Sequence, residues 1–302
     1  MTRSTSPSDR AGRARPGLAV IDTPAAPPGW EDARAQLVRI VDPLGRAVAW
    51  LAPAHGGGCV GFAVRPAGAH GTDWVHVFHA EPSPTLCEAP HGGGCGVCCA
   101  LVTAGPGAAI APAGGWRFVE RDPTAATLAT ALVGNATGAA GGHDSGVHLS
   151  FSADLTDGAL ALHLVAENRA TEVRKLHLGL RLALVGSLFG PAPGSIRVDL
   201  PGSNLRQDTG DTGAGFPPQA VVGLGGPDTP LRVAVALVAG VTRLRYLAPG
   251  ERGVVGLVAN AGDGPDSILT LNPGETFQLA VALDVAVSVT GYPRGYDDHA
   301  DG

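Results

Sequence analysis

The chain has 302 residues, with 21 Lys and Arg against 27 Asp and Glu, and a formal net charge of −6. This balance lacks the basic excess that favours nucleic acid or an anionic membrane as a partner, so we expect neither. No apolar run reaches the roughly 18 residues that a transmembrane helix needs. With 45 Gly, 25 Pro and 44% hydrophobic residues, the composition is typical of many strands and turns around a large core.

Both ends of the chain differ in composition from its middle. The N-terminal stretch MTRSTSPSDRAGRARPG is charged and has no apolar segment after it, so it does not predict a secretory signal. We therefore expect a cytoplasmic protein. Residues 1–30 are predicted to be a disordered lead-in and residues 292–302 a flexible tail. Residues 31–291 have even apolar content and are predicted to form one domain.

Between these ends, apolar residues alternate with polar ones at the period of a β-strand. The segment AQLVRIVDPLGRAVAWLAP predicts two strands joined by a turn at Pro43–Gly45, and only PGWEDARAQ before it is helix-like. DWVHVFHAE predicts a short strand, which places His76 and His79 on opposite faces. GWRFVERD and ATLATALVG are expected to pair as a hairpin.

The most regular hairpin follows. GVHLSFSADLTDGALALHLVAEN contains two alternating runs, with Asp157–Gly158 supplying the turn. Further strands are predicted in LRVAVALVA, RGVVGLVAN, SILTLN and TFQLAVALDVAVSV. The sequence therefore predicts an all-β protein built as one large antiparallel sandwich.

One strand, KLHLGLRLAL, raises a question about function. Its five leucines, at every second position from residue 176 to residue 184, share one face. The other face is either ordinary solvent-exposed surface or the floor of a binding site, and it carries Lys175, His177, Gly179, Arg181 and Ala183.

Five motifs in a fixed order bear on that question. They are DPLGRAVAWLAPAHGGGCVGF, HGGGCGVCCALVTAGPG, GGWRFVERD, LALHLVAENRA followed at once by RKLHLGLRLAL, and GLVANAGDGPDSILTLNPGETFQLAVALDV. In this order, over roughly residues 35–290, the chain resembles the galactose mutarotase-like (aldose 1-epimerase) superfamily. The resemblance implies a β-supersandwich of two large antiparallel sheets, with the ligand on a concave sheet face.

The resemblance also shows where this chain departs from the family. Mutarotation needs a Glu base and a His acid on opposite sides of one sugar. Matching the G-x-H strand of the family to GLR puts Arg181 at the acid's position, and an arginine stays protonated. The same matching puts Ala259 at the base's position and Ala108 at that of a second His. The chain is therefore expected to be a divergent member without standard mutarotation.

If the family's ligand face is retained, the Arg181 face is a pocket floor. Gly179 would allow a ligand to approach closely, and Arg181 would offer a two-pronged donor to a carboxylate, a phosphate or paired hydroxyls. In the alternative, the face is degenerate and Arg181 extends into solvent.

Two functions are expected on these grounds. The first is an isomerase-like or lyase-like enzyme that acts on a carbohydrate or another hydroxyl-rich metabolite in a repurposed pocket. The alternative is a non-catalytic carbohydrate-binding or structural protein, and the oligomeric state stays open. The catalytic candidates are His177, Arg181, His79 and His148. The ligand-binding candidates are Arg181, Lys175, Trp116, Arg206 and Asp208.

A cysteine cluster offers a metal alternative. Cys87, His91, Cys95 and Cys98 could together supply the ligand types that a structural zinc prefers. Buried core thiols explain these cysteines more simply, so no metal or other cofactor is expected. The glycine-rich loop with Asp208 and Asp211 could hold calcium, although a solvated loop is the simpler interpretation.

Overall fold

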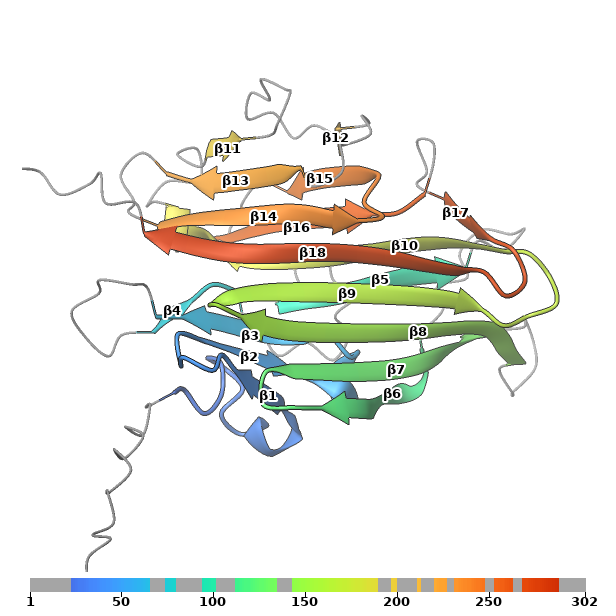
Figure 1. Cartoon of the computed structure of the whole chain (residues 1–302), viewed down its shortest axis with the longest axis horizontal. Helices are drawn as coiled ribbons and strands as arrows, with labels where there is room; N and C mark the ends of the chain where they lie inside the picture. Colours follow the sequence, from blue (N-terminus) through green and yellow to red (C-terminus); the bar gives the residue numbers. More distant parts are fainter. Residues whose placement is uncertain are drawn as a thin grey trace, which may run out of the picture.

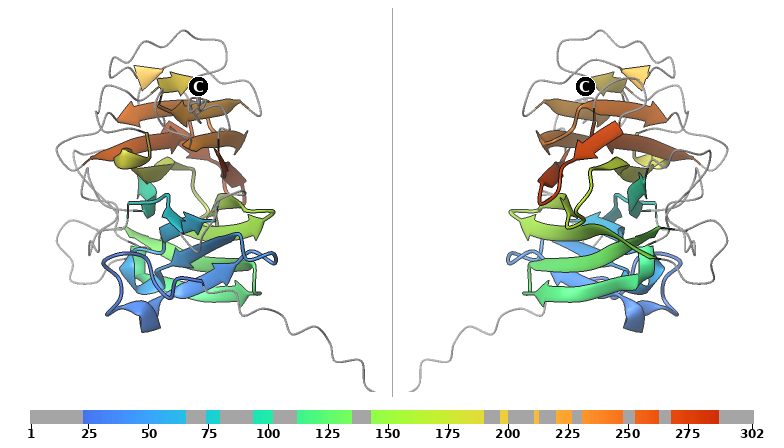
Figure 2. Two further views of the ribbon diagram at one scale, coloured as in Figure 1. Left: turned by 90° about the vertical axis from the view of Figure 1, so that its left-hand side faces the viewer. Right: turned by 90° about the vertical axis from the view of Figure 1, so that its right-hand side faces the viewer.

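The computed structural model describes residues 23–65, 74–79, 94–101, 112–134, 143–189, 197–199, 211–212, 220–226, 231–247, 253–262 and 268–287. Within these ranges, two antiparallel sheets lie face to face around a shared hydrophobic core (Figures 1 and 2). The only helical elements among these residues are three short 3-10 turns, namely η1 (Arg34–Gln36), η2 (Pro53–His55) and η3 (Gly186–Phe189). The predicted all-β sandwich is confirmed.

Sheet A, the ten-stranded sheet, has the order β1-β2-β3-β5-β10-β16-β15-β12, with β4 paired to β3 and β17 paired to β10. Its strands are β1 (Val38–Val41), β2 (Ala47–Leu51), β3 (Cys59–Val64), β4 (Val75–His76), β5 (Gly94–Leu101), β10 (Arg174–Val185), β12 (Asp211–Thr212), β15 (Arg243–Leu247), β16 (Val254–Asn260) and β17 (Ile268–Leu271). The strand that raised the functional question, β10, is therefore central in this sheet.

Sheet B, the eight-stranded sheet, has the order β11-β13-β14-β18-β9-β8-β7-β6. Its strands are β6 (Pro112–Arg121), β7 (Ala125–Gly134), β8 (His143–Thr156), β9 (Ala159–Asn168), β11 (Arg197–Asp199), β13 (Val221–Gly225), β14 (Leu231–Ala239) and β18 (Thr276–Val287). The predicted β6–β7 and β8–β9 hairpins both form, the second across Asp157–Gly158.

The core lies between the two sheets and follows from the alternation in the sequence. Along β9, every second residue from Leu160 to Ala166 is fully buried, and the residues between them are partly exposed. The leucines of β10 face sheet B from the other side, and none is more than 1% exposed. Burial of these aliphatic side chains is the main favourable term in folding.

A second, smaller hydrophobic cluster covers part of the outer face of sheet A. It joins Trp30 to Val48, Trp50, Val60 and Ala63 from β2 and β3. Trp30 is 1% exposed, and the indole of Trp50 donates a hydrogen bond to the carbonyl of Ala25. Ala25 and Trp30, which belong to the expected lead-in, thus pack against the sheet.

Two buried polar side chains fix the connections between strands. The Asp42 carboxylate accepts hydrogen bonds from the backbone N–H groups of Leu44, Arg46 and Gly158, each at 3.2 Å. It thereby joins the β1–β2 turn to the β8–β9 turn.

Asn168, at the end of β9, is fully buried. Its amide donates to the carbonyls of Glu172 and Leu271, both at 2.9 Å, and its oxygen accepts from the N–H of Ala170 at 3.0 Å. These bonds fix the connection that leads into β10, the strand that carries the candidate site.

Candidate functional site

Arg181 lies near the middle of sheet A, on the face that points away from the core. It is only 8% exposed, and its Nε is buried. In the sheet register it lies between Gly96 of β5 and Val258 of β16. Gly96 therefore contributes no side chain beside the arginine. The alternative in which Arg181 extends into solvent is therefore wrong.

The strands on one side of Arg181 bring further polar groups to the same face. Asn260 is the register partner of Gly179, and Arg243 is the partner of Asn260 on the next strand. Arg245 lies opposite Val258 and is exposed. Strands are about 4.8 Å apart, so the positions of Arg245 and Arg181 are roughly 10 Å apart. This face therefore has three guanidinium positions and one amide within reach of a single small molecule.

Gly179 determines how closely Asn260 can lie to β10. A Cβ atom built on Gly179 would collide with Oδ1 of Asn260 and would lie 3.0 Å from the carbonyl oxygen of Ala259. The glycine therefore makes space for a protein side chain, the Asn260 amide.

Of the predicted histidines, His79 lies nearest to Arg181. Its backbone N–H donates to the carbonyl of Ala183 at 2.9 Å, and Phe78 before it bridges to Leu184. Since Phe78 is buried in the core, His79 is on the outer face. Diagonal neighbours on paired strands are roughly 7–8 Å apart, and this is the relation of His79 to Arg181.

His177 and Lys175 are on the same face but farther along β10, and both are exposed. At about 3.3 Å per residue they lie roughly 13 Å and 20 Å from Arg181. His79 is level with Ala183, which follows Arg181 along β10, whereas His177 precedes Arg181. His79 and His177 therefore cannot contact one monosaccharide-sized ligand together. The structure therefore separates the predicted His177–Arg181 pair.

Two other predicted site residues lie elsewhere in the sandwich. His148 is on the outer face of sheet B, so the whole core separates it from Arg181. Trp116 is 6% exposed and belongs to the core, where its ring centroid is 6.4 Å from that of Phe151. Neither can line a pocket with Arg181, because period-two alternation directs these positions to other surfaces.

The remaining predictions concern Arg206, Asp208, Cys87 and His91, which lie outside the described residues, as does Ala108. Cys95 and Cys98 are on β5, paired in register with Leu182 and Gly179. Within the described ranges, no three His, Cys, Asp or Glu residues lie close enough to hold a metal ion. Likewise, no helix in those ranges is long and apolar enough to cross a membrane.

Cys59, on β3, is the one cysteine whose side chain is described in detail. It is fully buried, and its Sγ donates to the carbonyl of Gly61 at 3.3 Å. Burial raises the pKa of this thiol to about 12, so it is not a nucleophile at neutral pH. Cys59 is therefore a core thiol, whereas the clustered cysteines are not tested by this observation.

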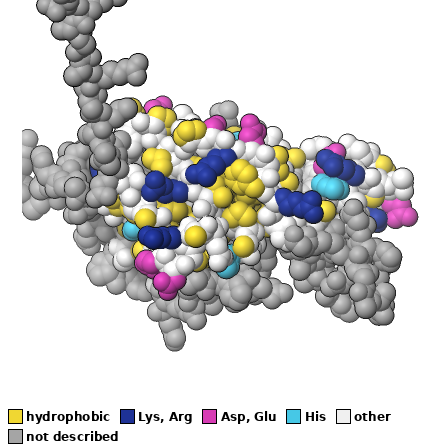
Figure 3. Space-filling view, turned by 90° about the horizontal axis from the view of Figure 1, so that it is seen from below, with side chains coloured by type: hydrophobic (Ala, Val, Ile, Leu, Met, Phe, Trp, Pro, Cys, Tyr) yellow, Lys and Arg dark blue, Asp and Glu magenta, His cyan; other side chains and the backbone are white. Residues whose placement is uncertain are grey.

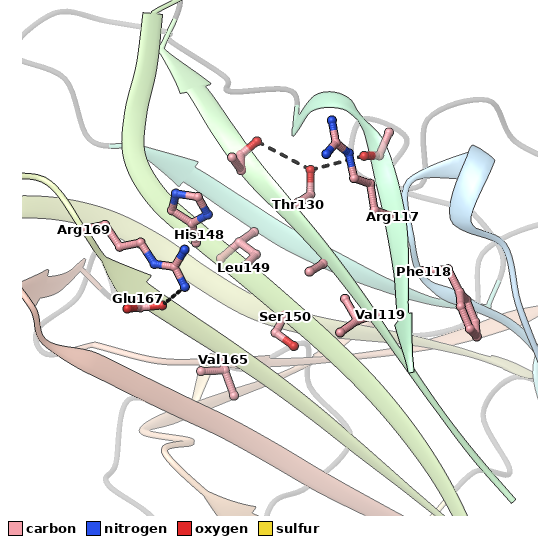
Figure 4. A pocket seen from close by; sticks show the side chains of 13 residues that line it. Arg117, Phe118, Val119, Thr130, His148, Leu149, Ser150, Val165, Glu167 and Arg169 are labelled. Carbon is pink, nitrogen blue, oxygen red and sulfur yellow. Dashed lines mark hydrogen bonds and ion pairs between the residues drawn. The ribbon is translucent and has the colours of Figure 1, made fainter. Parts of the chain in front are cut away.

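A hollow of about 550 Å³ opens on the outer face of sheet B (Figure 4). Its floor follows two rows of register partners across β6, β7, β8 and β9. One row runs Arg117, Ala129, Ser150 and Val165. The other runs Ala131, His148 and Glu167. The two middle strands, β7 and β8, contribute mainly small side chains, and the outer strands, β6 and β9, contribute larger ones.

The charged groups of this hollow come from its two sides. Arg117 stands on the β6 side, and on the β9 side Nη2 of Arg169 lies 2.6 Å from Oε2 of Glu167. That hydrogen bond lowers the pKa of the Glu167 carboxyl. His148 lies between the two sides, opposite Glu167 in the register (Figure 4).

The geometry can be compared with that of known proteins. No protein-family model and no curated protein matches the chain. Solved structures do match. The Slr1438 protein from Synechocystis sp. PCC 6803 superposes with a TM-score of 0.61 at 15% identity, covering 83% of this chain and 96% of that one. A proposed aldose 1-epimerase from Escherichia coli K12 superposes with a TM-score of 0.59 at 13% identity, covering 83% of this chain and 99% of that one.

A galactose mutarotase-like protein from Lactobacillus casei ATCC 334 superposes with a TM-score of 0.52 at 13% identity, covering 82% of this chain and 99% of that one. The chain has the galactose mutarotase-like fold. The fold expected from the order of the five motifs is thereby confirmed.

One position that the sequence match assigned to the ligand face does not lie on the face of Arg181. Ala259 is 2% exposed and lies in the core, so it cannot occupy the position of a base on the ligand face. Its neighbour Asn260 is on that face instead, one residue along the strand. An amide has no titratable proton, so Asn260 cannot act as a base.

The prediction from sequence missed the residues that adjoin Arg181. Asn260, Arg243 and Arg245 belong to strands whose pairing with β10 depends on contacts distant in sequence. The only signal was the polar alternation in the segment TRLRYL, which contains two of these arginines.

Proposed function

We propose that the outer face of sheet A in this mutarotase-like protein binds a small, hydroxyl-rich anion, such as an acidic sugar. The observation that carries the proposal is the 8% exposure of Arg181 in the middle of the sheet. A guanidinium held low on a sheet loses hydration and favours an anionic partner with which it forms two parallel hydrogen bonds.

The neighbouring side chains support the same ligand class. Arg245 and Arg243 add positive charge at positions roughly 10 Å and 12 Å from Arg181, which strengthens attraction for a carboxylate or phosphate. Asn260 supplies both a donor and an acceptor, the combination that recognises sugar hydroxyls.

The proposed site also offers a route to catalysis of the isomerase-like or lyase-like kind. His79, roughly 7–8 Å from Arg181 across paired strands, is the proton carrier in this proposal. Arg181 stabilises the negative charge that develops when a proton leaves the carbon next to a carboxylate. Binding without turnover is the alternative, in which the same residues only recognise the ligand.

Binding is tested by calorimetric titration with galacturonate and, in parallel, with the neutral sugar galactose. We expect the acid to bind more tightly. Arg181→Ala should weaken binding of the acid by about 1.5–3 kcal/mol, the scale of a hydrogen bond to a charged group. Arg181→Lys should restore little, because lysine lacks the planar fork. Arg232→Ala, on the other sheet, is the matched control and should bind normally.

Equal affinity for acid and neutral sugar, or normal binding by Arg181→Ala, would contradict the proposal. Catalysis is tested separately by following galacturonate by proton NMR in deuterated buffer. Turnover or exchange that His79→Gln abolishes while binding persists would support the enzyme. Binding with no chemical change in the wild-type protein would identify the non-catalytic alternative.

A further inference from the structure

The hollow on sheet B is a concave surface for which the proposed function has no use. It lies on the opposite side of the core from Arg181, so no ligand can contact both. Its centre is hollow because Ala129, Ala131 and Ser150 are small, whereas the strands on either side carry Arg117 and Val165. Four strands spaced about 4.8 Å apart span roughly 14 Å, the length of a two-ring organic molecule.

The charge of this hollow is opposite in sign to that of the chain. The whole protein has a formal charge of −6, yet the lining has two arginines and His148 against one acid, Glu167. That acid is engaged by Arg169. Arg117, on the other side, is exposed and forms no ion pair with any acid in the part of the chain that the structure describes. An anionic group would therefore be attracted to the Arg117 side.

The same hollow also has exposed apolar surface. Val119 is 61% exposed and Phe118 is 45% exposed, and both belong to the β6 side of the lining. Figure 3, which views the molecule from the side of β1 and β6, shows hydrophobic side chains beside Lys and Arg side chains on this edge of the sandwich. Apolar surface beside an arginine matches a ligand with an apolar body and one anionic group.

We propose that this hollow is a second binding site, which takes a small aromatic or aliphatic carboxylate. The apolar body of the ligand lies over Ala129, Ala131 and Val165, and its carboxylate pairs with Arg117. The volume of about 550 Å³ is within the range of sites for molecules of this size. The site shares no residue with the sheet A face and does not depend on the proposed function.

The test uses a naphthalene carboxylate as the probe and the corresponding neutral carboxamide as its partner. Binding is followed by the intrinsic fluorescence of the probe and, independently, by saturation-transfer NMR. We expect the carboxylate to bind at least tenfold more tightly than the amide. Arg117→Ala should weaken carboxylate binding about tenfold, as expected for loss of one charged hydrogen bond, without changing affinity for the amide.

A second variant, Ala129→Glu, fills the floor of the hollow and adds a negative charge, so it should abolish binding of the carboxylate. Arg232→Ala removes an arginine from the same sheet outside the hollow, and Arg181→Ala removes the arginine of the other face. Both should bind the probe normally. Equal binding of the two probes, or equal losses in Arg117→Ala and Arg232→Ala, would overturn the proposal. Unchanged circular dichroism and melting temperature establish that each variant is folded.

Discussion

Gly179 illustrates how much of the candidate site depends on the absence of a side chain. Its missing Cβ leaves the space that the Asn260 amide occupies, which brings the amide onto the face of Arg181. From the sequence, a glycine in the middle of a strand indicated only that something approaches closely. Which group approaches depends on the pairing of β10 with β16, which the local alternation does not specify.

His76 provides a residue-scale prediction about pH. Its ring is half-buried and stacked on Trp50, with 6.2 Å between centroids, and burial lowers its pKa. A histidine whose pKa is lower in the folded state binds its proton first in the unfolded chain. The contribution of neutral His76 to the free energy of unfolding is complete above the usual histidine pKa near 6.5 and is lost as the pH falls below that value.

His76→Phe keeps the stacked ring and removes this titration. We expect its unfolding free energy to fall less than that of the wild type between about pH 7.5 and pH 5.5, across the usual histidine pKa. Urea denaturation at the two pH values measures the difference. His177→Phe, at an exposed position, is the control and should retain the wild-type dependence. Identical pH dependence in wild type and His76→Phe would contradict the assignment.

At the scale of strands and turns, we predict that Asp42 stabilises the protein by linking the β1–β2 turn to the β8–β9 turn. Asp42→Ala removes the acceptor for three backbone N–H groups and leaves them partly buried. We expect a loss of roughly 2–4 kcal/mol in unfolding free energy, measured by chemical denaturation. Asp157→Asn, which removes the exposed ion pair with Arg46 but tolerates the positive φ of this turn position, should cost less than about 1 kcal/mol. Similar losses in both variants would show that the buried carboxylate has no special role.

The strands found from sequence and those missed differ in a physical way. β8, β9, β14 and β18 face the core on one side and solvent on the other, so their residues alternate and were predicted. All six residues of β3 are buried, because the main core covers one face and the Trp30–Trp50 cluster covers the other. A strand covered on both faces has no alternation to detect. β2 is also buried at all five residues, and it was predicted from the turn signal at Pro43–Gly45 that precedes it.

The candidate site was only partly predictable for a related reason. Alternation placed Lys175, His177 and Arg181 correctly on one face of β10. It could not place His148 or Trp116 relative to that face, because their positions depend on which sheet each strand joins. The burial of Ala259 shows the same limit, since shifting a strand by one residue exchanges core and surface.

For the molecule as a whole, the corrected site predicts an absence of the activity associated with the fold. Arg181 stands where the match made from the sequence expects the acid, and neither its guanidinium nor the Asn260 amide on the same face can carry a proton in mutarotation. Polarimetry with glucose or galactose should therefore show no mutarotation above the rate in buffer. Losing one positioned proton carrier commonly costs about a hundredfold to ten-thousandfold in rate. Rapid mutarotation by the wild type that Arg181→Ala leaves intact would show that other residues supply both protons.

The distribution of aromatic residues affects how unfolding of this protein is observed. Of the four tryptophans in the chain, Trp30 and Trp50 belong to the small cluster outside sheet A, and Trp74 packs against it. Only Trp116 reports on the interior between the sheets. Intrinsic fluorescence is therefore weighted toward the N-terminal attachment. Release of residues 23–37 from β2 and β3 would produce a large emission change while the sandwich, followed by far-UV circular dichroism, stays folded.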